Sequence, residues 1–199
     1  MKSILAVTLL LYSFFTIAQE CTEANAITFQ KEINAQYANP YESPLTKKDR
    51  ENFKSLDFYP IDTNFCVAAK LVRTPNEKPF EMATTTDRKP VYVKYGEVYF
   101  TIAGKEYKLD VFRNTMAAKM EAYKNSLFLP FTDLTSGDES YAGGRYIDLT
   151  IPEGDTIIID FNTAYNPYCT YNHKYSCPIP PAQNDLQVAI KAGVKAYKK

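Results

Sequence analysis

The sequence has 199 residues, of which 45% are apolar and 23% are charged, as is usual for a globular protein. Its 23 basic and 23 acidic side chains give a formal net charge of zero. Because nucleic-acid-binding proteins usually carry a basic excess, we expect no nucleic-acid partner. With 7 Gly and 12 Pro, the composition also excludes collagen-like chains and flexible linkers.

Residues 1–18 are typical of a secretory signal peptide. Lys2 gives a positive start, an almost unbroken apolar run follows from Ile4 to Ile17, and Ala18 is a small residue suited to cleavage. The run is shorter than the about 20 residues of a membrane-spanning helix. We therefore expect residues 19–199 to form a single, mostly β domain that is exported, periplasmic or extracellular, with no membrane span.

Four cysteines in an exported chain indicate disulfides. Cys169 and Cys177 lie eight residues apart in a proline-rich loop, and we expect them to pair and to staple this C-terminal loop. Cys21 and Cys66 either pair with each other or leave Cys66 as a buried thiol. A lipid anchor on Cys21 is disfavoured, because a small residue normally precedes a lipidated cysteine and Glu20 stands there.

Hydrophobic periodicity predicts one helix near the N-terminus. In residues 22–38, apolar side chains recur every three or four positions, as in a helix with one buried face, and Asn39-Pro40 ends the pattern. Thr46 and Asp49 form a variant capping box, which predicts a short second helix that extends to about Ser55.

After the two helices, alternating apolar and polar residues predict strands. We expect them at residues 65–72, 80–86, 91–95, 98–103, 106–112, 127–131, 145–151 and 156–161. Gly96 and Gly104 mark turns, and the last two strands should pair as a hairpin. Short helices are expected at 115–124 and 184–196. The pattern predicts a mainly β (α+β) fold, a single antiparallel sheet or barrel-like domain.

Four sequence runs concentrate the polar and glycine residues: FTDLTSG at 131–137, YAGGRYID at 141–148, DFNTAYNPYC at 160–169 and CPIPP at 177–181. Together they resemble a large bacterial family of exported proteins that is known only as a domain of unknown function. The resemblance covers most of residues 19–199. It implies no activity, so the chemistry has to be inferred from the residues.

Arg145 is the most informative charged residue. On its strand, Arg145, Ile147 and Leu149 share one face, whereas Tyr146, Asp148 and Thr150 share the other. One hairpin register places Arg145 diagonally next to Asp160, which is interpreted either as a structural ion pair or as part of an anion site. Gly143 and Gly144 would expose backbone N–H groups to the same anion. A register shifted by one residue places Tyr146 opposite Asp160 instead.

Catalytic and metal-binding motifs are scarce. His173, the single histidine, lies between Cys169 and Cys177, so any Ser or Cys nucleophile would depend on it as base. The three residues supply only three of the four ligands of a structural zinc site. We expect no cofactor and no metal. Asp148 and Asp160 would suit a glycosidase only if they lie about 5–9 Å apart in a cleft.

Six tyrosines between positions 141 and 175 suit a sugar or another polar ring, and they suit core packing equally. We expect a binding module for a small polar or anionic ligand around Arg145, such as an envelope saccharide fragment. The alternatives are a hydrolase with Asp133, Asp148 or Asp160 as acid or base, and a structural or interaction protein without a pocket. The candidate binding residues are Asp133, Tyr141, Gly143, Gly144, Arg145, Asp148, Asp160, Asn162, Tyr165 and Asn166.

Overall fold

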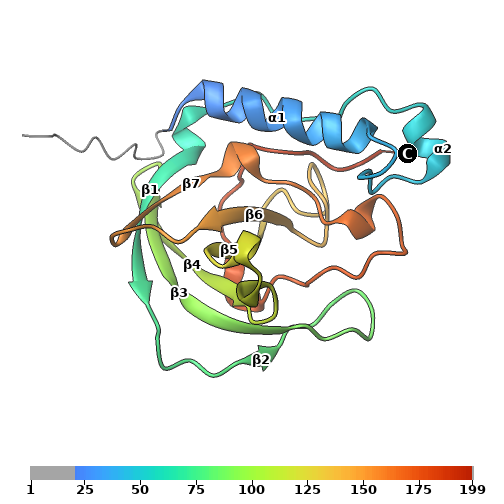
Figure 1. The fold of residues 1–199 in the computed structure, drawn as a ribbon. Coiled ribbons are helices and arrows are strands. Elements are labelled where there is room, and N and C mark those ends of the chain that lie inside the picture. Colours follow the sequence, from blue (N-terminus) through green and yellow to red (C-terminus); the bar gives the residue numbers. More distant parts are fainter. Residues whose placement is uncertain (1–20, 199) are drawn as a thin grey trace, which may run out of the picture.

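A computed structural model describes residues 21–198, and the predicted signal peptide lies outside them (Figure 1). The strands are Cys66–Arg73 (β1), Phe80–Glu81 (β2), Val91–Ile102 (β3), Lys105–Asn114 (β4), Ser126–Asp133 (β5), Arg145–Thr150 (β6), Thr156–Asp160 (β7) and Asp185–Leu186 (β8). They form one curved sheet in the order β6-β5-β4-β3-β1-β7, with β2 beside β3 and β8 beside β5. All pairs are antiparallel except β5 with β8. The prediction of a mainly β, antiparallel fold is confirmed.

One face of the sheet carries the main hydrophobic core. Leu127, Leu129 and Phe131 of β5 lie on this face, and so do Ile147 and Leu149 of the neighbouring β6. The residues between them, such as Phe128 and Asp148, point to the opposite face because side chains alternate along a strand. One face of β5 and β6 therefore packs in the main core, and the other face points away from it.

Helix α1, Glu23–Ala38, confirms the predicted N-terminal helix. The Thr22 side chain accepts a hydrogen bond from the backbone N–H of Asn25 and so caps the first turn. Ile33 and Tyr37 are buried against the segment before β1 and against Val194 near the C-terminus. The capping residues of α2, Lys47–Glu51, are as predicted, but the helix ends at Glu51.

Two glycines that were both expected in turns have different roles. Gly104 follows Ala103, and both have positive φ values (78° and 49°) in the tight β3–β4 turn. Gly96, in contrast, lies inside the continuous strand β3, where the register with β4 shifts. A Cβ on Gly96 would lie 2.5 Å from the carbonyl oxygen of Val72, so the close approach of β1 requires glycine there.

The predicted hairpin of residues 145–151 and 156–161 is wrong, although both strands exist. Strand β6 pairs with β5 and β7 pairs with β1, so the two strands lie at opposite ends of the sheet order. Their turn connects the two edges of a half-barrel. The turn signal at residues 152–155 correctly ended a strand but did not determine the pairing, since β6 pairs with the preceding strand β5 and β7 pairs with the distant strand β1.

Three other predicted elements differ. Residues 80–86 form only the short β2, and residues 115–124 contain two single-turn 3-10 helices, Ala117–Lys119 and Glu121–Tyr123. Residues 185–196 are not helical, and Asn184 only ends the single-turn 3-10 helix Ala182–Asn184. Among residues 21–198, none of the helices has the length and apolar character that crossing a lipid bilayer requires.

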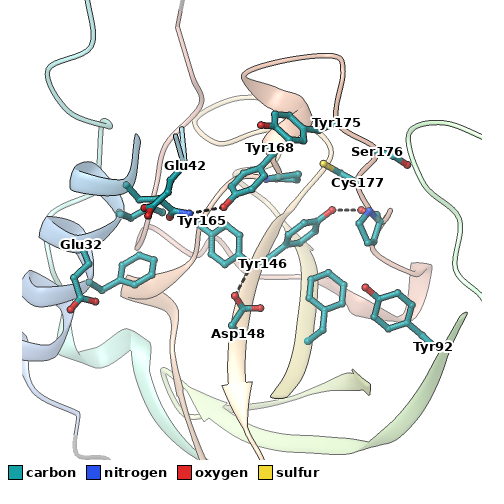
Figure 2. A pocket seen from close by; sticks show the side chains of 16 residues that line it. Glu32, Glu42, Tyr92, Tyr146, Asp148, Tyr165, Tyr168, Tyr175, Ser176 and Cys177 are labelled. Carbon is teal, nitrogen blue, oxygen red and sulfur yellow. Dashed lines mark hydrogen bonds between the residues drawn. The ribbon is translucent and has the colours of Figure 1, made fainter. Parts of the chain in front are cut away.

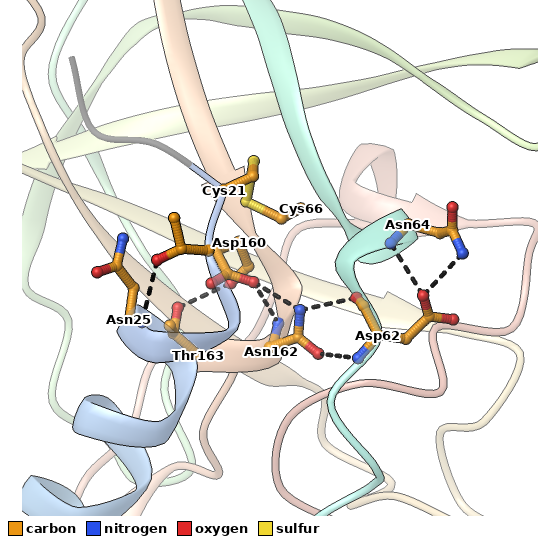
Figure 3. Close-up of a disulfide and its surroundings, with 9 residues drawn as sticks. Cys21, Asn25, Asp62, Asn64, Cys66, Asp160, Asn162 and Thr163 are labelled. Carbon is orange, nitrogen blue, oxygen red and sulfur yellow. Dashed lines mark hydrogen bonds between the residues drawn. A yellow bond between two sulfur atoms is a disulfide. The ribbon is translucent and has the colours of Figure 1, made fainter.

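The disulfide joins Cys21 to Cys66, with the two Cα atoms 5.5 Å apart (Figure 3). It fastens Cys21, two residues before the start of α1, to the first residue of β1, beside Asp160 of β7. Cys169 and Cys177 are free, buried thiols, so the predicted disulfide in the C-terminal loop is wrong. Hydrogen bonds fasten this loop instead, because the backbone N–H groups of Thr85 and Ile179 bind Cys177 O and Ala83 O, each at 2.9 Å.

Replacement of both Cys21 and Cys66 by Ser should lower the free energy of unfolding by about 4 kcal/mol, the chain-entropy estimate for a loop of 45 residues. Urea denaturation with and without reductant measures this loss. Reductant should destabilise the wild-type protein and leave the double variant unchanged. A wild-type midpoint that is insensitive to reductant would contradict the assigned disulfide.

Candidate functional site

A pocket of about 720 Å³ lies on the face of β5 and β6 that is opposite the core (Figure 2). We call it the tyrosine pocket because it is lined by Tyr92, Tyr146, Tyr165, Tyr168 and Tyr175. Helix α1 forms one wall, β3, β5 and β6 form the floor, and residues 165–178 form the far wall. Its volume lies within the range of about 300–1,000 Å³ that is typical of small-molecule sites.

Asp148 and Tyr165 are the central polar pair of the tyrosine pocket. The Tyr165 hydroxyl donates a hydrogen bond to Asp148 Oδ2 at 2.8 Å (Figure 2). Burial among surrounding protein atoms raises the pKa of Asp148 above its ordinary value, and the bond from Tyr165 offsets part of this shift. Asp148 still contacts solvent, so its carboxyl group is available to a ligand.

The aromatic rings of the pocket pack edge to face. The ring centroids of Tyr146 and Tyr165 lie 5.9 Å apart at 89°, and those of Phe128 and Tyr146 lie 4.8 Å apart at 73°. The Tyr146 hydroxyl donates to Pro178 O, and Gln36 Nε2 donates to the Tyr168 hydroxyl at 3.0 Å. The first bond connects the floor of the pocket to the far wall, and the second connects α1 to the far wall. Together they fix the orientations of the Tyr146 and Tyr168 rings.

Only two of the ten predicted binding residues, Asp148 and Tyr165, line the tyrosine pocket. The sequence analysis missed the lining residues that come from distant segments. The helical stripe that contains Phe29 and Ile33 was a usable signal, but it was assigned to the core alone. The missed lining residues from these distant segments are Phe29, Glu32, Ile33, Gln36, Glu42, Tyr92 and Phe128.

Arg145 does not belong to this pocket, because it lies on the other face of β6 and is fully buried. Its Nη2 binds Asp133 Oδ1 at 3.2 Å, and its guanidinium also donates to the carbonyls of Ile190, Ala192 and Val194. We call this arrangement the Arg145 lock. Burial lowers the pKa of Arg145, and the Asp133 charge opposes the shift. The expectation that Arg145 binds a ligand, or pairs with Asp160, is therefore wrong.

The Arg145 lock explains why residues 185–196 are not a helix. Gly193, with a φ of 79°, bends the chain, so that the carbonyls of residues 190, 192 and 194 all reach the guanidinium. A helix would direct these carbonyls along its axis instead. Asp133 also accepts the backbone N–H of Ile190 at 2.7 Å, so the segment is bound from both its donors and its acceptors.

The other predicted polar residues stabilise turns. Asp160 accepts from the backbone N–H and Nδ2 of Asn162, and Asn162 in turn exchanges two hydrogen bonds with the backbone of Asp62 (Figure 3). Asn166 donates to Lys195 O at 2.8 Å. These three side chains are buried and join β7, the segment before β1 and the C-terminal segment.

Gly143 and Gly144 serve the entry into β6. Gly144 has a φ of 83°, and a Cβ there would lie 2.5 Å from Phe131 O. A Cβ on Gly143 would meet the ring of Tyr141 at 2.5 Å. The glycines therefore allow the chain to pass closely over β5 and Tyr141, and neither of them lines the tyrosine pocket.

The two free thiols lie at the edge of the tyrosine pocket, and Cys177 lines it. A hydrogen bond from the Cys177 thiol lowers the pKa of Cys169 to about 6, against the effect of burial. The backbone N–H of Cys169 also contacts Cys177 Sγ at 3.1 Å. Within residues 21–198, no three His, Cys, Asp or Glu side chains are grouped as metal ligands.

These features define a class: a mainly β half-barrel with a small-molecule-sized pocket between its N-terminal helix and the outer face of the sheet. The chain belongs to the family described as "Protein of unknown function (DUF1684)", which matches residues 51–195. Helix α1, and with it one wall of the tyrosine pocket, lies outside the matched residues.

The fold is similar to the solution NMR structure of the uncharacterized protein from gene locus rrnAC0354 of Haloarcula marismortui. The two chains are 30% identical, with a TM-score of 0.68, and the similarity covers 87% of this chain and 93% of the other. A comparison with curated proteins finds no match.

Arg145→Met should lower the free energy of unfolding by about 3–5 kcal/mol, because Asp133 is then left buried without its counter-charge. Lys78→Met, which removes a positive charge at an exposed position between β1 and β2, is the control and should cost less than about 1 kcal/mol. Urea denaturation of both variants measures the difference. Equal stability of the two variants would contradict a structural role for Arg145.

Proposed function

We propose that the protein is an exported binding protein whose small ligand occupies the tyrosine pocket. The observation that carries the proposal is the pocket itself: about 720 Å³, walled by aromatic rings, with a small set of polar groups that include Asp148. Such a combination of apolar walls and few polar groups is characteristic of small-molecule sites. The proposal moves the ligand from Arg145 to the opposite face of β6.

Export is supported by two features. Residues 1–18 have the pattern of a signal peptide, and the Cys21–Cys66 disulfide is of the kind that persists in oxidising compartments. The disulfide also engages the sulfur of Cys21, which a lipid anchor would need. We therefore favour a free periplasmic or extracellular protein over a lipoprotein.

Thermal unfolding with a panel of sugars, sugar acids, phosphates, amino acids and amines tests the binding function. A ligand at a hundred times its dissociation constant adds about 2.7 kcal/mol of stability. We expect at least one class to raise the midpoint of the wild-type protein. Tyr175→Ala, which removes one wall, should lose this increase, whereas Tyr41→Ala, at a position 95% exposed and outside the pocket, should keep it.

If no class of ligand raises the midpoint, or if Tyr175→Ala responds like the wild type, the pocket is not the binding site.

The third alternative expected from the sequence, a structural or interaction protein without a pocket, does not describe this structure.

The environment of Asp148 favours a second candidate function, a hydrolase with Asp148 as general acid. A carboxyl group whose pKa is raised by burial stays protonated to higher pH and can donate its proton to a leaving group. Glu32 and Glu42 line the same pocket and offer a second carboxylate. Asp133 and Asp160, which were also expected to act as acid or base, are buried elsewhere.

The hydrolase candidate predicts turnover of chromogenic glycosides that Asp148→Asn reduces by about 10²–10⁴-fold. Activity should fall as the pH rises through the pKa of Asp148, because only the protonated acid is active. Glu153→Gln, in the exposed β6–β7 turn, is the control and should leave turnover unchanged. Equal turnover by the wild type and Asp148→Asn would eliminate this candidate.

A further inference from the structure

We propose that the tyrosine pocket binds a small organic cation, an amine or a quaternary ammonium compound. This inference rests on the proposed binding function and narrows its ligand class. The sequence predicts a polar or anionic ligand only if Arg145 belongs to the site. With Arg145 on the opposite face of β6, the charges that line the pocket point to the opposite sign of ligand.

The described side chains that line the pocket carry negative charge and no positive charge. Glu32, Glu42 and Asp148 line the pocket, and none of the described lining residues is Lys, Arg or His. Within residues 21–198, no basic nitrogen lies within 4 Å of these three carboxylates, although other carboxylates of the protein do have such partners. An anionic ligand would meet only like charges, whereas a cation would supply the missing counter-charge.

The aromatic rings that line the pocket also favour a cationic ligand. Ring faces carry negative potential, so they attract an ammonium group, and recognition of quaternary ammonium by aromatic cages uses this effect. Tyr168 and Tyr175 meet at 5.3 Å and 63°, and Tyr146 and Tyr165 meet nearly at a right angle, so rings surround the cavity from several directions (Figure 2).

The protein already contains one contact of this type at the pocket wall. The ammonium of Lys174 lies 4.9 Å from the ring centroid of Tyr175. Lys174 is exposed, is not part of the lining, and forms no ion pair with the carboxylates that line the pocket. The contact illustrates that a tyrosine of this wall accepts an ammonium group.

Asp148 lies on the floor of the tyrosine pocket, where its carboxylate favours a cationic ligand. Its Oδ2 accepts one hydrogen bond, from Tyr165, on a strand whose neighbouring side chains Tyr146 and Phe128 are aromatic. A carboxylate in such surroundings is stabilised by a nearby positive charge. A ligand ammonium above the Tyr165 ring could contact this ring and Asp148 together.

The test compares organic cations with neutral molecules of the same shape. Choline is compared with 3,3-dimethylbutan-1-ol, in which carbon replaces the charged nitrogen, and putrescine with butane-1,4-diol. Binding to the full exported chain is measured by calorimetry and thermal unfolding at matched ionic strength. We expect choline or putrescine to bind at least about tenfold more tightly than its neutral counterpart.

Asp148→Asn keeps an oxygen that can accept from Tyr165 but removes the charge. It should weaken cation binding at least about tenfold and leave the midpoint of the free protein equal to or higher than that of the wild type. Glu153→Gln makes the same change of charge in an exposed turn and should bind the cation as the wild type does.

The outcomes separate this inference from the proposed function. If neutral sugars bind in the pocket and neither cation does, or if Asp148→Asn binds the cations as tightly as the wild type, the cation assignment is overturned and the binding function stands. If neither the cations nor any other class binds, both are overturned. Equal affinity for choline and its neutral counterpart would show recognition of shape without charge and also overturns the assignment.

Discussion

The buried ion pair between Arg145 and Asp133 is the interaction on which the rest of the structure depends. It joins the end of β5 to the start of β6, and three backbone carbonyls extend it to the C-terminal segment. Val194 on that segment is in turn buried against α1. Because α1 forms one wall of the tyrosine pocket, the lock on the core face also positions this wall of the pocket.

The separation of these two roles follows from the alternation of side chains in one strand. Arg145, Ile147 and Leu149 face the core, and Tyr146 and Asp148 face the pocket. The family match covers the sheet and the lock, while α1 lies before it. The carboxylates Glu32 and Glu42 come from α1 and the loop after it, so this N-terminal part contributes much of the pocket's charge.

Local patterns in the sequence predicted the local structure well. The apolar stripe predicted α1, and Thr46 with Asp49 predicted the N-terminal cap of α2. The alternation of apolar and polar residues predicted β4, β5, β6 and β7. Pairing could not be predicted, because no local signal shows that β6 pairs with the strand before it or that β7 pairs with β1, which is distant in sequence. Contacts between distant residues of the site could not be predicted either. Asp148 and Tyr165 were identified as site residues, but Arg145 pairs with Asp133 instead of Asp160. The non-helical form of residues 185–196 depends on the guanidinium that binds the carbonyls of residues 190, 192 and 194, and no local signal reports it.

Native-state hydrogen exchange of the wild-type protein tests the central claim most directly, since it needs no substitution. The backbone N–H of Ile190 lies outside the regular strands but donates to Asp133 at 2.7 Å within the Arg145 lock. The account predicts that it exchanges only through global unfolding, with the same free energy as the amides of β5. Exchange of Ile190 at the rate of an exposed loop would show that the C-terminal segment opens independently, and that Arg145 does not fix the architecture.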